Sequence, residues 1–567
     1  MNNWIKIFQS ILICSVLMLS FGAIPLFAQE RASNNKFGIH LAKPADEDID
    51  DANALVNGNG GSWGYVTMVM QEDDRNKGQW QGTFDKLREL KLIPIIRIAT
   101  KPEGGNWRRP SKEDAEEWAN FLDSLHWVVK ERYVILFNEP NHATEWGGSV
   151  DAQNYTEVAK VFAEKLHAKD RNFVVMMAGL DDAAPSAVPS YEDSGNYIET
   201  VVKGLGDGVY ENLFDAVSSH SYANPAFAGS PNGYGKGSVR SYQWQLNLLK
   251  ELGVEKDFPI FITETGWDAE AIGRDTTAVY LENAFNNVWL PDNRVKAVTP
   301  FILNYQGEPF LKFSFRKLTV RDFYPQYDKL RSMKKVTGKP QIEERGQIVF
   351  NLPKELVEDS NYHYTITVKN DGEGYWASNH GYKVVLTDGK SYFIANLPNI
   401  KPFETKAVDF YFKTDKPSAM QEHRFALYRN DERILESIPW KYRVMPLPSL
   451  NVKAKFFPKL DTTSNKFEIQ IFDDKEELVY KKKNVQIKDE IGEIRAIRNI
   501  SIGKQYRIVI LHPNYLPRQT YITFTVGENN IEFERMLPFD FNGDGALDWT
   551  DVWPGLSDPS KLGGFMP

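Results

Sequence analysis

Eight short apolar runs recur between residues 36 and 339, and stretches with the period of an amphipathic helix lie between them. Each run is apolar along almost its whole length, which is typical of strands buried on both faces of a parallel sheet. The runs cover residues 37–41, 63–70, 92–99, 133–140, 172–180, 213–222, 258–267 and 296–305. Eight strand–helix units predict a closed (β/α)8 barrel, the TIM barrel, over residues 36–339.

A doubly wound open sheet is the alternative fold for the same strand–helix alternation. That fold binds nucleotides through a glycine-rich turn of the form G-x-G-x-x-G after an early strand. No turn of this form follows an early strand in the sequence. The barrel is therefore the favoured prediction.

Alternating polar and apolar residues replace the barrel pattern after about residue 340, with an Asp-Gly turn at 371–372. Such alternation is typical of sheets with one buried face. It predicts two all-β sandwich modules, an immunoglobulin-like (Ig-like) one over residues 342–446 and a second accessory one over 449–537. The stretch 368–376, VKNDGEGYW, also resembles bacterial Ig-like accessory domains.

The composition narrows the class of ligand. The 567 residues carry a formal net charge of −9 with a pI near 5.7, whereas binding to nucleic acid requires a basic surface. An acidic chain with 13% aromatic residues suits a neutral polar ligand better. The single cysteine, Cys14, excludes a disulfide framework.

The first residues carry an export pattern. Lys6 precedes an apolar stretch over residues 7–27, which ends at the small residue Ala28. This order is typical of a secretory signal peptide, which we predict over residues 1–28. An uncleaved membrane anchor is the alternative, because the stretch is long enough to span a bilayer. After cleavage the chain would be extracellular or periplasmic and free of the membrane.

Polar side chains follow the predicted barrel strands, and in a TIM barrel the loops at that end of the strands carry the chemistry. Two of these side chains, Glu139 and Glu264, are carboxylates that follow strongly apolar strands. Cleavage of a glycosidic bond needs one carboxyl group to protonate the leaving oxygen and a second to act on the sugar carbon. Strands four and seven lie on opposing sides of a barrel mouth, so the two carboxylates are predicted to face each other across a sugar.

The motifs around these glutamates resemble glycoside hydrolase clan A. FNEPN at 137–141 and ITETGW at 262–267 are similar to the motifs that follow strands four and seven in that clan. The resemblance implies that Glu139 is the general acid/base, that Glu264 is the nucleophile, and that Asn138 binds the neighbouring sugar hydroxyl. It also implies retention of the anomeric configuration through a covalent intermediate.

Three further site residues follow from the same resemblance. His220 and Tyr222, in the stretch HSY, would lie in the sugar-binding network and beside the nucleophile. Arg97, at the end of the third strand, would support the charge of Glu264. The motifs are mixed between families of the clan, which leaves the sugar and the linkage open.

Aromatic side chains near the strand ends are candidates to stack on a sugar ring. The candidate tryptophans are Trp63, Trp107, Trp146 and Trp267, and we favour Trp146 and Trp267 because they closely follow the two predicted catalytic strands. Many clan members carry a tryptophan after strand eight, but this sequence has FILNYQ there. Tyr305 or Trp267 would have to replace it.

Other polar residues complete the candidate set. His40 and Asn304 are predicted substrate ligands at the ends of the first and last strands. For His40 a structural role in capping the barrel is the alternative. Glu145 and Glu308 are predicted to be ordinary loop carboxylates.

Residues 540–551, DFNGDGALDWTD, have the spacing of a calcium loop. Oxygen-bearing side chains occupy positions 1, 3, 5, 9 and 12, with a glycine at position 6 where the loop turns sharply. The predicted ligands are Asp540, Asn542, Asp544, Asp548 and Asp551. The loop resembles a dockerin loop, but a dockerin has two and residues 538–560 supply one. We therefore expect structural Ca2+ rather than docking to a cohesin-type partner, and no cofactor for catalysis.

Together these patterns and the resemblance to clan A predict a secreted retaining glycoside hydrolase that cleaves a β-linked poly- or oligosaccharide by double displacement. The two β modules would be spacers or carbohydrate-binding units. The alternative is a non-catalytic glycan-binding or adhesion protein built on a glycosidase-like barrel.

Overall fold

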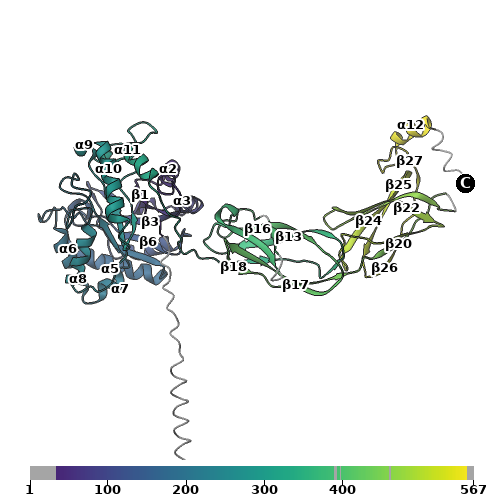
Figure 1. Cartoon of the computed structure of the whole chain (residues 1–567), viewed down its shortest axis with the longest axis horizontal. Helices are drawn as coiled ribbons and strands as arrows, with labels where there is room; N and C mark the ends of the chain where they lie inside the picture. The colour runs from purple at the N-terminus through teal and green to yellow at the C-terminus, as the bar shows by residue number, and fades with distance from the viewer. Residues whose placement is uncertain (1–33, 388–391, 396, 459–460, 559–567) are drawn as a thin grey trace, which may run out of the picture. The chain divides into compact units, whose positions relative to one another are not determined.

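The structure is a computed structural model that describes residues 34–387, 392–395, 397–458 and 461–558. The predicted signal peptide lies outside the described residues. The chain divides into two compact units, one ending at Glu343 and the other beginning at Glu344, and each is described by itself (Figure 1). Within the described ranges, no helix has the length and apolar character needed to cross a bilayer.

The first unit is built on eight parallel strands. They are β1 (Gly38–Leu41), β2 (Gly64–Gln71), β3 (Leu92–Ala99), β6 (Arg132–Leu136), β7 (Phe173–Met177), β8 (Val217–His220), β9 (Ile260–Glu264) and β10 (Val295–Val298). Five pair in the order β1-β2-β3-β6-β7 and three in the order β10-β9-β8. Parallel bridges from Met176 to Ala216 and from Phe37 to Val298 join the two sheets at both edges. The ring is closed, so the predicted barrel is confirmed and the open sheet is excluded.

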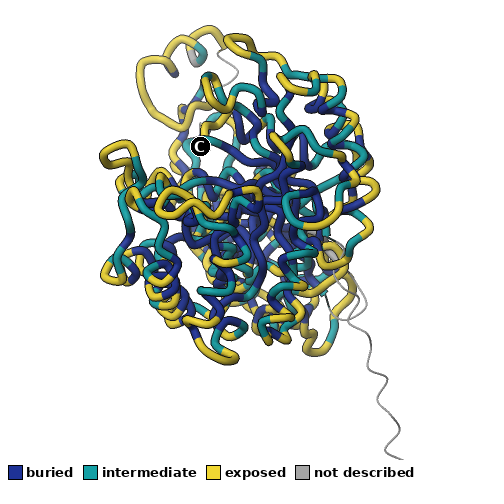
Figure 2. The backbone as a smooth tube through the Cα atoms, turned by 90° about the vertical axis from the view of Figure 1, so that its left-hand side faces the viewer, coloured by how far each residue is buried: buried dark blue, intermediate teal, exposed yellow. Residues whose placement is uncertain are grey.

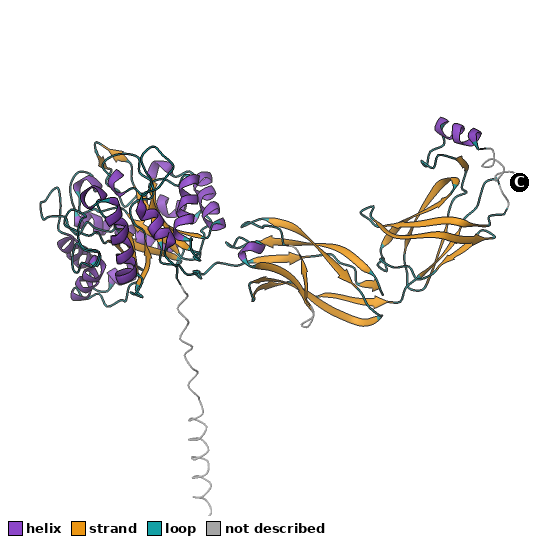
Figure 3. Ribbon diagram, turned by 45° about the horizontal axis from the view of Figure 1, so that its top comes forward, coloured by secondary structure: helices purple, strands orange, loops and turns teal. Residues whose placement is uncertain are grey.

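Helices follow the strands and surround the ring (Figure 3). They are α2 (Asp46–Val56), α3 (Lys77–Glu89), α4 (Asp114–Asp123), α5 (Ala152–Lys169), α6 (Ser194–Leu205), α7 (Val209–Leu213), α8 (Ser241–Glu251), α9 (Ala269–Ile272), α10 (Arg274–Ala284) and α11 (Pro325–Ser332). The side chain of Asn76 caps α3 and that of Asp151 caps α5, each by accepting a backbone N–H bond of the first turn. In α4 the buried residues Ala115, Trp118 and Leu122 recur at helical spacing, which turns one apolar face toward the sheet.

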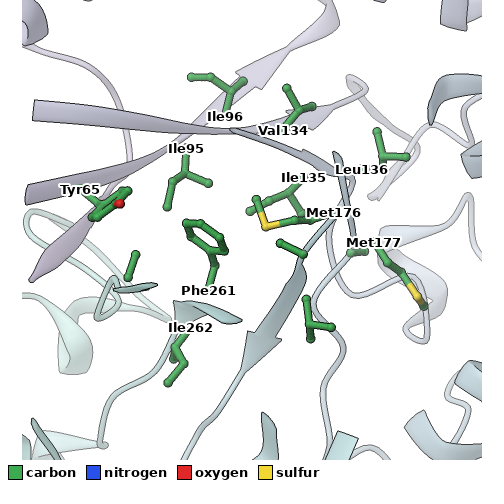
Figure 4. Close-up of a cluster of buried hydrophobic side chains, with 14 of the residues drawn as sticks. Tyr65, Ile95, Ile96, Val134, Ile135, Leu136, Met176, Met177, Phe261 and Ile262 are labelled. Carbon is green, nitrogen blue, oxygen red and sulfur yellow. The ribbon is translucent and has the colours of Figure 1, made fainter. Parts of the chain in front are cut away.

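The strands are apolar on both faces because both faces are covered. Ile95, Ile135, Met176 and Phe261, from β3, β6, β7 and β9, gather inside the barrel (Figure 4) and are almost fully buried. The neighbouring Ile96 points the opposite way along the pleat (Figure 4) and is also buried. Buried backbone gathers at the centre of the view in Figure 2, and exposed backbone lies around the outside. Each such side chain stabilises the fold by about 1.5–3 kcal/mol.

Short elements at the strand ends shape the mouth of the barrel. They are the hairpin β4 (Pro102–Glu103) and β5 (Asn106–Trp107) and the 3-10 turns η1 (Glu72–Asp74), η2 (Ala143–Glu145) and η4 (Leu311–Phe313). The π-helical turn η3 (Phe285–Trp289) instead extends α10 before β10, at the opposite end of the barrel. Gly104 and Gly105 form the hairpin turn with φ of +60° and +85°, a region that favours glycine.

The second unit begins with a sandwich of two sheets. One contains β11 (Gly346–Val349), β13 (Asn361–Asn370) and β16 (Thr405–Lys413); the other contains β12 (Glu355–Val357), β14 (Tyr382–Thr387), β15 (Tyr392–Ala395), β17 (Ser418–Arg429), β18 (Glu432–Glu436) and β19 (Trp440–Met445), with the turn η5 (Ser378–His380) before β14. Ile366 and Val408 of the first sheet share one core with Leu386 and Phe425 of the second. The first β module is therefore a β-sandwich, as predicted.

The strands from 449 onward form one continuous sheet of eight strands. They are β20 (Ser449–Lys453), β21 (Ser464–Phe472), β22 (Leu478–Lys488), β23 (Ile491–Ile494), β24 (Gln505–His512), β25 (Asn514–Thr523), β26 (Glu528–Glu532) and β27 (Pro538–Asp540). Their apolar faces share one core that includes Leu450, Ile469 and Ile508. The module is a sheet curled round its core instead of two hydrogen-bonded sheets, and α12 (Trp549–Ser557) follows it.

Candidate active site

A pocket of about 440 Å³ opens at the carboxyl ends of the barrel strands. Arg97 of β3, the residues 137–139 after β6, and Glu264 of β9 line it. Its walls are rich in aromatic rings, which are Trp107, Phe137, Tyr222, Phe227, Phe301, Phe310 and Phe313. Apolar walls with a few convergent charged groups are typical of a site for a small organic ligand.

The two predicted carboxylates meet in this pocket. A carboxylate oxygen of Glu139, one of Glu264 and a ring nitrogen of His220 all lie within 4.8 Å of one another. Among the described residues this is the one group of three acidic or histidine side chains that come so close. The Glu139 side chain is 19% exposed and that of Glu264 is 9% exposed. Retaining glycosidases hold their two carboxyl groups about 5–5.5 Å apart, and this pair fits that spacing.

Glu264 is held as a carboxylate by its neighbours. Arg97 donates from Nη1 to Glu264 Oε1 at 2.5 Å, and Tyr222 donates its hydroxyl to Glu264 Oε2 at 3.0 Å. Burial acts to raise the pKa of Glu264, but His220 and Arg97 outweigh it and lower that pKa to about 2. Arg97 also donates to Asn138 Oδ1 at 2.5 Å, which ties the amide into the same network.

Glu139 is bonded to a buried histidine. His220 Nδ1 lies 2.7 Å from Glu139 Oε1 and 3.9 Å from Glu264 Oε2. Burial acts to lower the pKa of His220, but the charges of Glu264 and Glu139 outweigh it and hold that pKa above its usual value. The backbone N–H of Glu139 donates to the carbonyl of Gly179 at 3.1 Å. Hydrogen bonds thus connect Glu139 to His220 and to Gly179, and the three residues come from the ends of three different strands.

The backbone leaves the strand before Glu139. β6 ends at Leu136, not at residue 140 as predicted, and Phe137 and Glu139 have φ of +74° and +28°. Non-glycine residues rarely adopt positive φ, and such strain is typical of functional sites. The bend brings Asn138 and Glu139 to the pocket wall.

His40 lies beside the pocket without lining it. Its Nε2 is 3.7 Å from Glu264 Oε1, its side chain is buried, and neither ring nitrogen has a hydrogen-bond partner among the described residues. Burial, reinforced by Arg97, lowers the pKa of His40 to about 3. His40 is therefore a neutral ring packed against the Glu264 network.

Both favoured tryptophans prove to be core residues, and the prediction that they stack on sugar is wrong. Trp146 is 0% exposed and packs on Phe137 and Tyr155; Trp267 is 1% exposed and donates from Nε1 to the carbonyl of Gly229. A fully covered ring has no face to offer a ligand. The tryptophan that lines the pocket is Trp107, on β5.

The residues predicted after the last strand also lie away from the pocket lining. Asn304 donates from Nδ2 to the carboxylate of Asp48 at 3.1 and 3.2 Å. The ring of Tyr305 packs edge-on against Phe310, which does line the pocket. Asn304 is thus occupied by an internal partner, and Tyr305 supports the pocket wall from behind.

Several residues that line the pocket are not among the predicted site residues. His142, Glu145, Asp181 and Lys312 line the pocket. The prediction that Glu145 is an ordinary loop carboxylate is wrong, because burial and the nearby charge of Glu139 raise the pKa of Glu145 to about 7. The proximity of His142 and Glu145 to Glu139 in the sequence was the one available signal.

The predicted calcium loop lies in the second unit. Asp540 and Asp551 are buried, and one oxygen of Asp551 accepts the backbone N–H groups of residues 541 and 542. Burial, with added repulsion from Asp551 and Asp544, raises the pKa of Asp540. The loop aspartates form no group of three within the spacing found for Glu139, His220 and Glu264 among the described residues. The crowding of like charges around Asp540 nevertheless suits a cation.

No protein-family model matches the chain, and no curated protein is similar enough in sequence to match it. Among solved structures, XacCel5A in complex with cellopentaose is 14% identical, covers 53% of this chain and 98% of its own, and has a TM-score of 0.36. A xyloglucanase of Paenibacillus polymyxa from glycoside hydrolase family 44 is 12% identical, covers 67% and 96%, and has a TM-score of 0.33. A family 51 α-L-arabinofuranosidase of Bifidobacterium longum is 10% identical with the same coverage and a TM-score of 0.33. TM-scores of this size do not decide a function, which has to come from the geometry of the site itself.

Proposed function

We propose that this chain is a secreted retaining glycoside hydrolase that cleaves β-linked bonds in a poly- or oligosaccharide by double displacement. The observation that carries the proposal is the approach of Glu139 and Glu264 to within 4.8 Å in a pocket, with Glu264 paired to Arg97. This spacing leaves no room for a water between the carboxylates, as an inverting mechanism would require. The N-terminal export pattern supports secretion.

In the first step Glu264 attacks the anomeric carbon. Its low pKa keeps it ionised, and Tyr222 and Arg97 hold its two oxygens in place. Glu139 donates its proton to the leaving oxygen as the glycosidic bond breaks, and the sugar remains bound to Glu264 as an ester.

In the second step Glu139, now a carboxylate, takes a proton from water. The hydroxide attacks the anomeric carbon, the ester bond to Glu264 breaks, and the sugar leaves with its original configuration. His220 Nδ1, 2.7 Å from Glu139 Oε1, can stabilise the charge that appears on Glu139 in this exchange. The aromatic walls, Trp107 among them, offer faces for the sugar rings.

The test is the pair of variants Glu139→Gln and Glu264→Gln, assayed on aryl β-glycosides and on plant and algal polysaccharides. Both should lose at least about a hundredfold in kcat, because each removes a group that acts in the transition state. Azide should partly restore the activity of the Glu139→Ala variant on substrates with a good leaving group. Nuclear magnetic resonance of the first product should show that the anomeric configuration is retained.

Glu251→Gln is the matched control, because Glu251 is an exposed residue at the end of α8. It should keep the activity of the wild type. Hydrolysis that persists in either catalytic variant contradicts the assigned roles. Glycan binding without any hydrolysis by the wild type would instead favour the non-catalytic alternative.

A further inference from the structure

Each cationic side chain that lines the pocket forms an ion pair with a carboxylate of this chain. The pairs are Arg97 with Glu264 at 2.5 Å, His142 with Asp181 at 2.9 Å, and Lys312 with Asp268 at 2.8 Å. An anionic group on a ligand would therefore have to displace an internal ion pair to find a positive partner. Such displacement leaves a buried charge unpaired, which is costly.

Glu145 is the pocket carboxylate without a basic partner. Glu139, Asp181 and Glu264 each have a histidine or arginine nitrogen within 4.0 Å, and among the described residues Glu145 has none. The amide of Asn138 supplies a hydrogen bond to it. Burial and Glu139 raise the pKa of Glu145 to about 7, against the opposing pull of the more distant Arg97. Above neutral pH Glu145 thus carries a negative charge without an ion-pair partner among the described residues.

We propose that Glu145 is a specificity-determining residue that restricts the pocket to sugar units without a carboxylate or sulfate group. The inference rests on the proposed function, because it names the substrate class of the same site. A neutral sugar can donate its hydroxyl hydrogens to Glu145, which satisfies the unpaired acceptor. A uronate would bring a second negative charge into a pocket whose other walls are aromatic, where neither charge is well solvated.

The test uses the full chain and oligosaccharides in matched pairs that differ only in a hydroxymethyl group or a carboxylate at C6, in the gluco, galacto and manno series. Calorimetry at about pH 8, above the pKa of Glu145, measures the dissociation constant of each member. We expect the wild type to prefer the neutral member by at least about tenfold. Glu145→Gln removes the charge but keeps the shape, and it should narrow the preference to about threefold or less.

Glu308→Gln is the matched control, since Glu308 is exposed and precedes the pocket residue Pro309. It should leave the preference unchanged. A wild type that binds both members equally, or a Glu145→Gln variant with an unchanged preference, overturns the inference, while hydrolysis of the neutral member still supports the proposed function. Preferential binding without turnover overturns the proposed function and leaves the charge selectivity standing. Binding of neither member in any pair overturns both.

Discussion

At the scale of single residues, one glycine positions both Glu139 and His220. The carbonyl of Gly179 accepts a hydrogen bond from the backbone N–H of Glu139. Because glycine has no side chain, there is space for the imidazole of His220 beside it. A Cβ at this position would collide with the ring atoms of His220. The same residue therefore positions both partners of the 2.7 Å contact between His220 and Glu139.

Gly179→Ala is expected to lower kcat/KM by about ten- to a hundredfold, because a displacement of about 1 Å in a catalytic contact can cost that much. The measurement is the kinetics on an aryl glycoside, with the melting temperature taken in parallel. Gly82→Ala is the control, since a Cβ on Gly82 in α3 meets no atom within 4 Å. If the effect acts through the imidazole, Gly179→Ala should add little to His220→Ala. Full activity of Gly179→Ala would contradict the positioning role.

At the scale of elements, the ends of strands and the turns after them decide what reaches the pocket. Glu139 lies in the pocket because the chain bends after Leu136, and Trp107 lies there because the β4–β5 hairpin carries it. By contrast, the chain after Trp267 carries that ring into the core. Of the residues that closely follow a strand, some therefore line the pocket and others are buried in the core.

The loop 540–551 is an element whose order we propose to depend on Ca2+. Binding should relieve the repulsion that contributes to the raised pKa of Asp540 and should fix the start of α12. We expect Ca2+ to protect residues 540–558 from limited proteolysis, with a chelator reversing the effect. Mg2+ is the control ion, and Asp544→Ala should abolish the protection. Cleavage that is indifferent to Ca2+ in the wild type would rule out the site.

At the scale of the whole molecule, the two units have separate cores. Among the described residues, the barrel core extends to Met333, and the cores of the second unit begin at Ile348. Every residue that lines the candidate active site lies between Val69 and Phe313. Among the described residues, the barrel core and the lining of the candidate site thus both come from the first unit.

A fragment that ends at Glu343 should keep kcat/KM on small soluble glycosides within about twofold of the full chain, since a domain with its own core can fold alone. Calorimetry of the full chain should show more than one unfolding transition. A fragment that is folded but inactive would mean that the second unit contributes to the site. A polymer assay with both proteins would then show separately whether the β modules bind glycan.

The eight strands, the closed barrel and the two carboxylates could be predicted from local patterns in the sequence. A strand buried on both faces must be apolar at every position, and the carboxyl ends of parallel strands all meet at one end of the ring. Glu139 and Glu264 follow two such strands, so their meeting could be predicted. The limits of the strands could not be predicted as well, because β6 ends at Leu136 and the apolar run had suggested residue 140.

The side chains that face the cavity could not be identified in this way. Trp146 and Trp107 are both tryptophans near strand ends, yet one is buried and the other lines the pocket. Among the described residues, Glu145 has no ion-pair partner within 4.0 Å, because His142 pairs with Asp181, and Arg97 with Glu264, from distant parts of the chain. The direction of a side chain in a loop and the charge that surrounds it are set by long-range contacts, which no local periodicity encodes.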